Sequence, residues 1–171
     1  MKQALLGCLL LSILFALAGC GDEPVSKEAL LNQEVSIQEV VDKADPDKAV
    51  EEIYKSVDVG GITTGNLQFV SDTLGIDPGI ITGFSLRYSS GDYGLADVII
   101  IRPDTGKKED VRTALLKYQE NRTAQFKNYD ILDAYSIAQN GLLYTQGDYI
   151  VLLMLADTAS AQEIIDLYIP R

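Results

Sequence analysis

Carboxylates are the only abundant acid–base side chains in this sequence. Its 171 residues include 25 Asp and Glu, two cysteines and no histidine. Without histidine there is no Ser-His-Asp or Cys-His catalytic arrangement and no imidazole ligand for a metal. Two cysteines are too few for a Cys₄ zinc site or a disulfide scaffold. Any acid–base catalysis by this chain would therefore have to use paired carboxylates.

Two carboxylate pairs have a spacing that could serve such chemistry. Asp92 and Asp97 flank a predicted hairpin turn, and Asp130 and Asp133 lie one helical turn apart. Glycosidases hold two carboxyl groups ~5–10 Å apart across a cleft, one of them with a raised pKa. A carboxylate-dependent hydrolase acting on cell-wall or extracellular glycans is therefore one functional alternative. Turns, helix caps and solvated surfaces use the same residue types more often.

Tyrosines beside the carboxylates indicate a second kind of site. The chain has nine tyrosines and no tryptophan, and Tyr88, Tyr93, Asp92 and Asp97 belong to one predicted hairpin. We call these four residues the predicted ligand face, which would suit a small ligand or an envelope protein. Aromatic rings on a sheet more often belong to the core or to cross-strand pairs.

The sequence predicts neither a metal site nor a cofactor. Asp42, Asp45 and Asp47 cluster in a way that oxygen-liganded calcium would accept, but the glycine and the terminal glutamate of an EF-hand loop are missing. Asp45 is better explained as a helix cap. The glycines are not followed by the GKS or GKT of a phosphate-binding loop.

Residues 1–20 have the pattern of an export signal. Lys2 precedes an apolar stretch over 4–18, and its length of about 15 residues falls short of the ~20 needed to span a bilayer. The end of this segment resembles the lipobox of bacterial lipoproteins, with Leu17, Ala18 and Gly19 before Cys20. In a lipobox the signal peptidase recognises the small residues and the cysteine is lipidated. An ordinary cleaved signal peptide that ends in cysteine is the alternative.

Lipidation at Cys20 would define where the protein resides. Two acyl chains anchor a protein stably, whereas one alone holds it marginally. We therefore expect residues 1–19 to be removed and palmitate-type lipid at Cys20 to hold the protein at the outer face of the cytoplasmic membrane, or at the outer membrane in a Gram-negative cell. Cleavage would remove Lys2 and Cys8, leaving 13 basic and 25 acidic residues and no disulfide. Such an excess of acid argues against nucleic acid as a partner.

The positions of apolar residues predict the elements that carry these side chains. Residues 20–45 are polar and acidic and are interpreted as a tether, and residues 46–171 as one domain. Helical spacing indicates helices over 46–57 and 107–128, a short helix within 129–140, and a final helix after Asp157. The stretch 60–78 is predicted to be a loop with one helical turn near 67–74.

Two segments have the alternation and turn residues of β-hairpins, 84–101 and 142–155. Phe84, Leu86 and Tyr88 alternate with polar residues, as in a half-buried strand. The run 150–155 is apolar on both faces, as in a central strand. The order α-β-β-α-β-β-α predicts an α+β fold with a mainly antiparallel four-stranded sheet and helices packed on one face.

Several short motifs occur in an order that is similar to one known family. They are Gly75-Ile76-Asp77-Pro78, Ala96-Asp97 before Val98–Ile101, the helix 111–118, Gly147-Asp148-Tyr149, and Asp157. With this spacing, residues 47–169 resemble the domain-of-unknown-function 4358 family, lipoproteins found mostly in Gram-positive anaerobes. The resemblance implies a surface-anchored domain and brings no activity, cofactor or catalytic residue with it.

These patterns together favour a non-enzymatic domain that binds a partner or ligand at the cell envelope, anchored to the membrane through Cys20. The glycan hydrolase is the main alternative. A substrate-binding lipoprotein of a transporter is a third hypothesis, although ~125 residues are few for the usual two-lobed closure.

Overall fold

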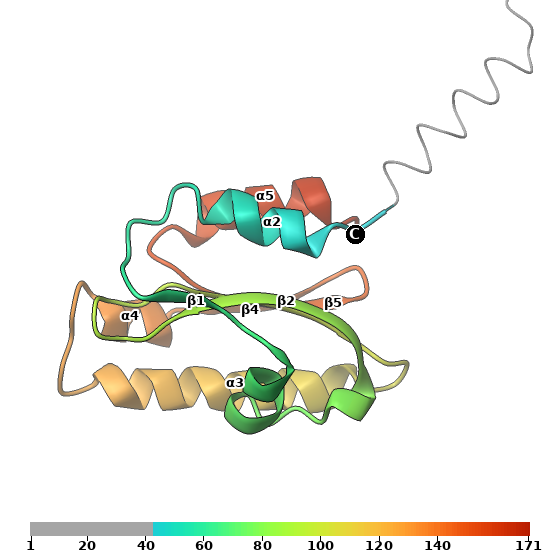
Figure 1. Ribbon diagram of the computed structural model, residues 1–171, viewed down its shortest axis with the longest axis horizontal. Helices are drawn as coiled ribbons and strands as arrows, with labels where there is room; N and C mark the ends of the chain where they lie inside the picture. The colour runs from blue at the N-terminus through green and yellow to red at the C-terminus, as the bar shows by residue number, and fades with distance from the viewer. Residues whose placement is uncertain (1–42) are drawn as a thin grey trace, which may run out of the picture. The chain divides into compact units, whose positions relative to one another are not determined.

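A five-stranded antiparallel sheet runs through residues 43–171, the part of the chain that the computed structural model describes. Its strands lie in the order β1-β2-β3-β5-β4. They are β1 (Ile62–Thr64), β2 (Ile81–Ser89), β3 (Asp97–Pro103), β4 (Leu142–Gln146) and β5 (Tyr149–Met154). Figure 1 shows the sheet nearly edge-on between two layers of helices.

The two central strands are buried on both faces. Val98, Ile99, Ile100 and Ile101 of β3 are all 0% exposed. Successive side chains of a strand point to opposite faces, so Ile99 and Ile101 join one apolar cluster while Val98 and Ile100 join the other. The same division applies to β5, which confirms the predicted central strand.

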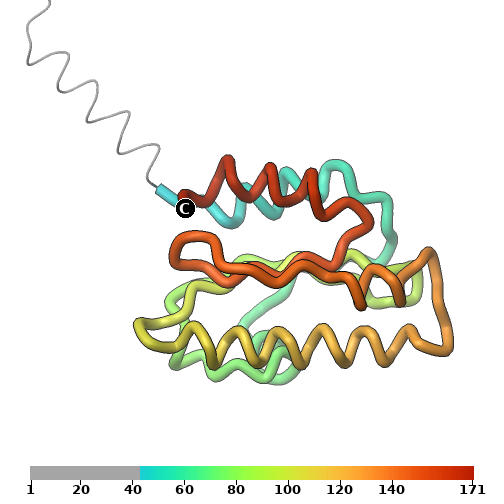
Figure 2. Tube along the Cα trace, turned by 180° about the vertical axis from the view of Figure 1, so that it is seen from behind, coloured from blue at the N-terminus to red at the C-terminus, as the bar shows by residue number. Residues whose placement is uncertain are grey.

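Helices α2 (Pro46–Ile53) and α5 (Thr158–Tyr168) cover one face of the sheet and pack against each other. Asp45 caps α2 by accepting a hydrogen bond from the Lys48 N–H at 3.1 Å, and Asp157 caps α5 in the same way. The Asp45 N–H also donates to the carbonyl of Tyr168, which joins the start of the described chain to its end (Figure 2).

The opposite face is covered by α3 (Lys108–Phe126), α4 (Ala134–Gln139) and a short π-helical segment, η1 (Phe69–Thr73). A 3₁₀ turn, η2 (Pro78–Ile80), leads from η1 into β2. Val111, Leu115, Tyr118 and Phe126 form the buried side of α3. Helices α3 and α5 both begin within a few residues of the starts that the sequence predicted.

The sheet differs from the prediction in having five strands. Residues 62–64, predicted as loop, pair with β2 in the register Ile62↔Ser89 to Thr64↔Arg87. Three residues are too few to show an alternating pattern, so this strand is defined by its backbone partners rather than by its side chains. The predicted helical turn near 67–74 is present as η1.

The helices lie on both faces of the sheet, whereas the sequence predicted helices on one face only. The polar side of β2 is therefore largely covered: Ser85 is buried, Arg87 is partly buried, and the Arg87 guanidinium lies 5.4 Å from the centre of the Tyr54 ring. The prediction of a half-buried β2 was wrong because α2 packs over that side.

Helix α2 ends at Ile53, four residues before the predicted end. The last turn tightens through hydrogen bonds from the Lys55 N–H to Glu52 and from the Ser56 N–H to Ile53. The Ser56 hydroxyl also donates to the Ile53 carbonyl at 3.0 Å. These bonds satisfy the carbonyls at the end of the helix without a further helical turn.

The hairpin predicted over 142–155 is confirmed: β4 pairs antiparallel with β5. Gln146 pairs with Tyr149, and Gly147 and Asp148 form the turn. Gly147 has φ +56°, a conformation that glycine adopts without a steric penalty. Within residues 43–171, no helix has the length and apolar character needed to cross a membrane.

The predicted signal sequence, Leu17, Ala18, Gly19, Cys20 and Asp42 lie outside the described residues.

Candidate functional site

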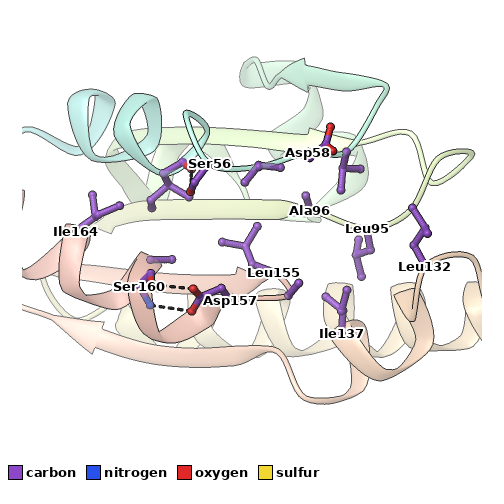
Figure 3. Close-up of a pocket in the computed structure, with 15 residues that line it drawn as sticks. Ser56, Asp58, Leu95, Ala96, Leu132, Ile137, Leu155, Asp157, Ser160 and Ile164 are labelled. Atoms are coloured by element: carbon purple, nitrogen blue, oxygen red, sulfur yellow. Dashed lines mark hydrogen bonds between the residues drawn. The ribbon is translucent and has the colours of Figure 1, made fainter.

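An apolar pocket lies at the end of the sheet where β3 begins and β5 ends. Its volume is about 300 Å³. Its side chains come from α2 and the segment after it, the segment before β3, the loop before α4 and α4 itself, and the segment after β5 with α5 (Figure 3). Its buried walls are aliphatic and are at most 7% exposed: Ile53, Leu95, Ala96, Leu155 and Ala161. We call this space the apolar pocket.

Two carboxylates flank the apolar pocket. Asp58 follows α2 and Asp157 precedes α5, and they lie on different sides of the pocket (Figure 3). No lysine or arginine is among the residues that line it in the described part of the chain. The pocket therefore combines aliphatic walls with a negatively charged rim.

Asp157 is held in place by α5. Its two carboxylate oxygens accept hydrogen bonds from the Ser160 N–H at 3.0 Å and from the Ser160 hydroxyl at 2.7 Å. These bonds favour the ionised carboxylate and lower the pKa of Asp157. Asp157 is thus a fixed negative charge.

One wall of the apolar pocket has a strained backbone. Leu132 and Asp133, between α3 and α4, have φ values of +51° and +59°. Residues other than glycine rarely adopt this left-handed backbone conformation. The Leu132 side chain lines the pocket while remaining 67% exposed. Asp130 supports the segment by accepting a hydrogen bond from the Tyr135 N–H at 2.8 Å.

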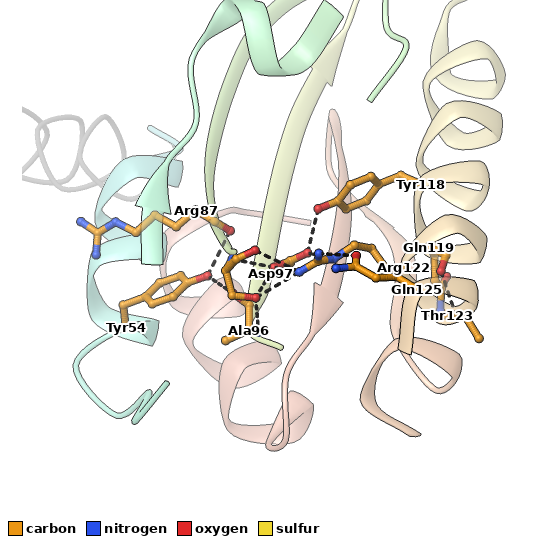
Figure 4. A network of polar contacts seen from close by, with 10 residues as sticks. Tyr54, Arg87, Ala96, Asp97, Tyr118, Gln119, Arg122, Thr123 and Gln125 are labelled. Atoms are coloured by element: carbon orange, nitrogen blue, oxygen red, sulfur yellow. Dashed lines mark hydrogen bonds and ion pairs between the residues drawn. The ribbon is translucent and has the colours of Figure 1, made fainter. Parts of the chain in front are cut away.

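A buried polar cluster lies beside the apolar pocket, around Asp97. Asp97 follows the pocket residue Ala96 and is 0% exposed. One carboxylate oxygen accepts from the Tyr118 hydroxyl at 2.8 Å and the Arg122 Nε at 3.0 Å. The other accepts from the Ser89 N–H at 2.8 Å and its hydroxyl at 3.1 Å. We call Ser89, Asp97, Tyr118 and Arg122 the Asp97 network (Figure 4).

The remaining donors of this network also have partners. The Arg122 guanidinium donates to the Ser89 carbonyl at 3.0 Å and to Gln125 at 2.8 Å. Among the described residues, the Tyr144 hydroxyl is the one buried side-chain polar atom without a hydrogen-bond partner, and it lies on β4. A buried ion pair with its hydrogen bonds complete is a structural element that has no free group for a ligand.

Two tyrosines near Asp97 are kept neutral. Burial raises the pKa of Tyr118, and the negative charge of Asp97 raises it further. The same two causes raise the pKa of Tyr54. The Tyr54 hydroxyl lies 2.7 Å from the Ala96 carbonyl and 3.0 Å from the Arg87 carbonyl, so it ties α2 to the sheet beside the apolar pocket.

The structure distributes the predicted ligand face over several places. Tyr88 stacks on Phe69 with ring centres 3.9 Å apart, under η1. Tyr93 is 62% exposed and packs against the loop after α2, near Gly60. Asp92 is exposed in the turn, whereas Asp97 is buried in its network. These four residues do not share one surface.

The carboxylate pairs also occupy structural positions. Asp130 bonds to the backbone of α4, and Asp133 precedes that helix in a left-handed conformation. Asp45, one of the aspartates weighed as calcium ligands, caps α2. No group of three or more His, Cys, Asp or Glu side chains in residues 43–171 is placed to hold a metal ion.

Sequence reasoning missed Arg122 and the apolar pocket. Arg122 lies four residues after Tyr118 and four before Phe126, on the stripe that α3 buries. A charged residue on an apolar stripe is a signal for a buried partner, and Asp97, next to a strongly apolar strand, is the matching one. No sequence pattern marks the pocket, because its residues come from several separate segments.

The fold and the site define a class of protein: an α+β domain with helices on both faces of an antiparallel sheet and an apolar pocket at one end of that sheet. Within this class, the chain belongs to the family described as domain of unknown function (DUF4358), whose model matches residues 55–155. The resemblance inferred from the motifs is thereby confirmed for the family. Comparison with curated proteins and with solved structures found no match.

Proposed function

We propose that this chain is a lipid-anchored extracytoplasmic protein whose domain binds a ligand or protein partner at the cell envelope and catalyses no reaction. The observation that carries the binding function is the apolar pocket, with its aliphatic walls and charged rim. Pockets that bind small ligands are mostly apolar, with a few polar groups that orient the ligand. The lipobox-like residues 17–20 support the anchor.

The charge states near the pocket favour binding over carboxylate catalysis. A glycosidase needs one carboxyl group with a raised pKa that can donate a proton. Hydrogen bonds from Ser160 shift the pKa of Asp157 in the opposite direction. Asp97, which the sequence offered as half of a catalytic pair, already accepts hydrogen bonds from three other side chains.

The anchor is tested by Cys20→Ala and fractionation of cells. We expect the variant to leave the membrane fraction, because it lacks the thiol that would carry the acyl chains. Cys8→Ala is the matched control, since the same substitution within the removed segment should leave the protein on the membrane. Continued membrane association of Cys20→Ala would contradict the lipid anchor.

Binding is tested by crosslinking in intact cells from defined positions. A photo-crosslinking residue at Leu132, on the wall of the apolar pocket, should form an adduct that the same residue at Leu167 does not form. Leu167 is 80% exposed on α5 and does not line the pocket. Equal labelling from both positions would contradict a pocket-centred function.

A further inference from the structure

We infer that the apolar pocket takes an organic cation: a compact apolar body of about ten non-hydrogen atoms that carries one ammonium group. This inference rests on the proposed binding function and specifies the chemistry of its ligand. It follows from the size of the pocket, the nature of its walls and the charge at its rim.

The volume of the apolar pocket limits the size of the ligand. The pocket encloses about 300 Å³, equal to about ten water molecules at ~30 Å³ each. Its buried walls are aliphatic, with Ile53, Leu95 and Leu155 among the larger side chains. Such walls favour a hydrocarbon group and give a polar body no hydrogen-bond partners.

The rim of the apolar pocket selects the charge of the ligand. Asp58 and Asp157 are its two ionisable groups, and no basic side chain in the described residues lines the pocket to balance them. Asp58 takes part in none of the ion pairs formed within residues 43–171. Its carboxylate is therefore available to an incoming ammonium group.

The N-terminus of α5 does not reverse this preference. A helix N-terminus attracts anions, but here Asp157 already occupies it through its bonds to Ser160. An ionised carboxylate has about four lone-pair sites, so two hydrogen bonds leave Asp157 able to accept from a ligand. An anionic ligand would meet Asp157 and Asp58 together.

The strained segment at Leu132 is consistent with a wall that serves binding. Leu132 is a large apolar side chain that lies on the pocket, is 67% exposed and sits in a left-handed conformation. Such conformations are unfavourable and cluster at ligand-binding sites. A bound apolar body would cover the exposed part of this side chain.

Three probes of similar shape test the inference: phenethylammonium, 2-phenylethanol and phenylacetate. Each is titrated into the purified full-length protein labelled at its Ala, Ile and Leu methyl groups, and binding is followed by NMR. We expect phenethylammonium to shift the Ala161 and Leu155 methyl resonances and to bind at least tenfold more tightly than the alcohol. Phenylacetate should bind most weakly, and added salt should weaken binding of the cation alone.

Two substitutions separate the pocket from its charge. Asp58→Asn should reduce the preference for phenethylammonium over 2-phenylethanol at least threefold, with methyl spectra that show an intact fold. Glu109→Gln removes a carboxylate outside the pocket and should leave the preference unchanged. Ala161→Phe should fill the pocket and abolish the shifts of all three probes.

The outcomes distinguish this inference from the proposed function. Equal affinity for the ammonium and the alcohol, with shifts at the pocket, would overturn the cationic ligand and leave the binding function standing. Shifts that avoid the pocket, or no binding by phenethylammonium, would also overturn the cation inference, whereas the crosslinking experiment decides on the binding function separately.

Discussion

The peptide bond between Ala96 and Asp97 separates two regions that are built in opposite ways. On one side, Asp97 is fully buried and its carboxylate is paired with Arg122 and hydrogen-bonded by Ser89 and Tyr118. On the other, Ala96 lines an apolar pocket with two carboxylates at its rim. The polar groups around Asp97 find their hydrogen-bond and charge partners within the protein. The pocket, in contrast, encloses space that the described residues do not fill, and no basic side chain among the described residues that line it neutralises its two carboxylates.

This difference distinguishes a structural role from a binding role among residues of the same type. Asp97 and Asp58 are both carboxylates near one end of the sheet, yet only Asp97 is neutralised by a buried partner. A buried charge has to be paired to be tolerated, whereas a charge at a rim remains available to a ligand. We therefore expect substitutions in the two regions to have different effects.

The largest effect is expected from Asp97→Ala, which would break the Asp97 network. It would leave the Arg122 guanidinium buried without its counter-charge, and breaking a buried pair in this way costs about 3–5 kcal/mol of unfolding free energy. Chemical denaturation measures the loss. Asp148→Ala is the control, because its pair with Arg102 is exposed and exposed pairs contribute ~0–1 kcal/mol. Similar losses in both variants would remove the structural role assigned to the network.

A smaller, pH-dependent effect is expected from Tyr118→Phe. At pH 7 this variant loses a hydrogen bond to a charged group, about 1.5–3 kcal/mol. Above pH ~10, the ordinary tyrosine pKa, the unfolded wild type releases a proton that folded Tyr118 retains, because burial raises its pKa. In this range the folded wild type binds one more proton than the unfolded wild type. The contribution of Tyr118 to the unfolding free energy therefore falls by ~1.4 kcal/mol per pH unit as pH rises toward the folded pKa.

The stability difference between wild type and Tyr118→Phe should therefore narrow above pH 10. Urea midpoints measured from pH 7 to pH 11 check this expectation. Tyr93→Phe is the control: its ring is 62% exposed and it is not part of the Asp97 network, so this substitution should cost little stability at pH 7. A Tyr118→Phe difference that stays constant as well would show that Tyr118 titrates normally in the folded protein.

The smallest effect, with the opposite sign, is expected at the apolar pocket. Leu132→Gly should stabilise the protein by about 1 kcal/mol, because glycine adopts φ +51° without a steric penalty and little buried contact is lost. The same substitution at Leu116, exposed in the middle of α3, should destabilise by about 1 kcal/mol. Thermal unfolding compares the two variants.

Leu132→Gly should also weaken binding of phenethylammonium, since it removes part of a pocket wall. A variant that is both more stable and poorer at binding would indicate that the strain at Leu132 serves binding. A less stable Leu132→Gly protein would show that this residue belongs to the structural frame, like the Asp97 network.

Elements with a strong local pattern were predictable from the sequence. The long helix, predicted over 107–128, spans Lys108–Phe126, and the second hairpin has its turn at Gly147 and Asp148 as expected. Helical periodicity, caps and turn residues act over a few positions and can be read directly. The end of α2 was missed because the hydrogen bonds that tighten its last turn leave no mark on the apolar pattern.

Features that depend on long-range contacts were not predictable in this way. The strand β1 is three residues long and is defined by pairing with β2. The placement of helices on two faces depends on which apolar stripe meets which side of β3, and all four residues from Val98 to Ile101 are apolar. The sequence therefore marks β3 as buried without assigning a helix to either side.

The candidate site shows the same limit. Asp97 was predicted as one of a carboxylate pair flanking the first hairpin turn, but its partners Ser89, Tyr118 and Arg122 come from β2 and α3. Asp92 and Tyr93, its neighbours in the predicted ligand face, are exposed in the turn. Sequence proximity grouped residues that packing then separated.

Composition and periodicity were enough to indicate the principal elements and the absence of histidine chemistry, because these properties depend on residue type and on short distances along the chain. The resemblance of the motifs to a known family indicated the family. Only the folded arrangement decided which carboxylate is neutralised and which is left at a rim. Burial and pairing are properties of contacts between distant segments, and it is those contacts that determine whether a charge supports the fold or remains available to a ligand.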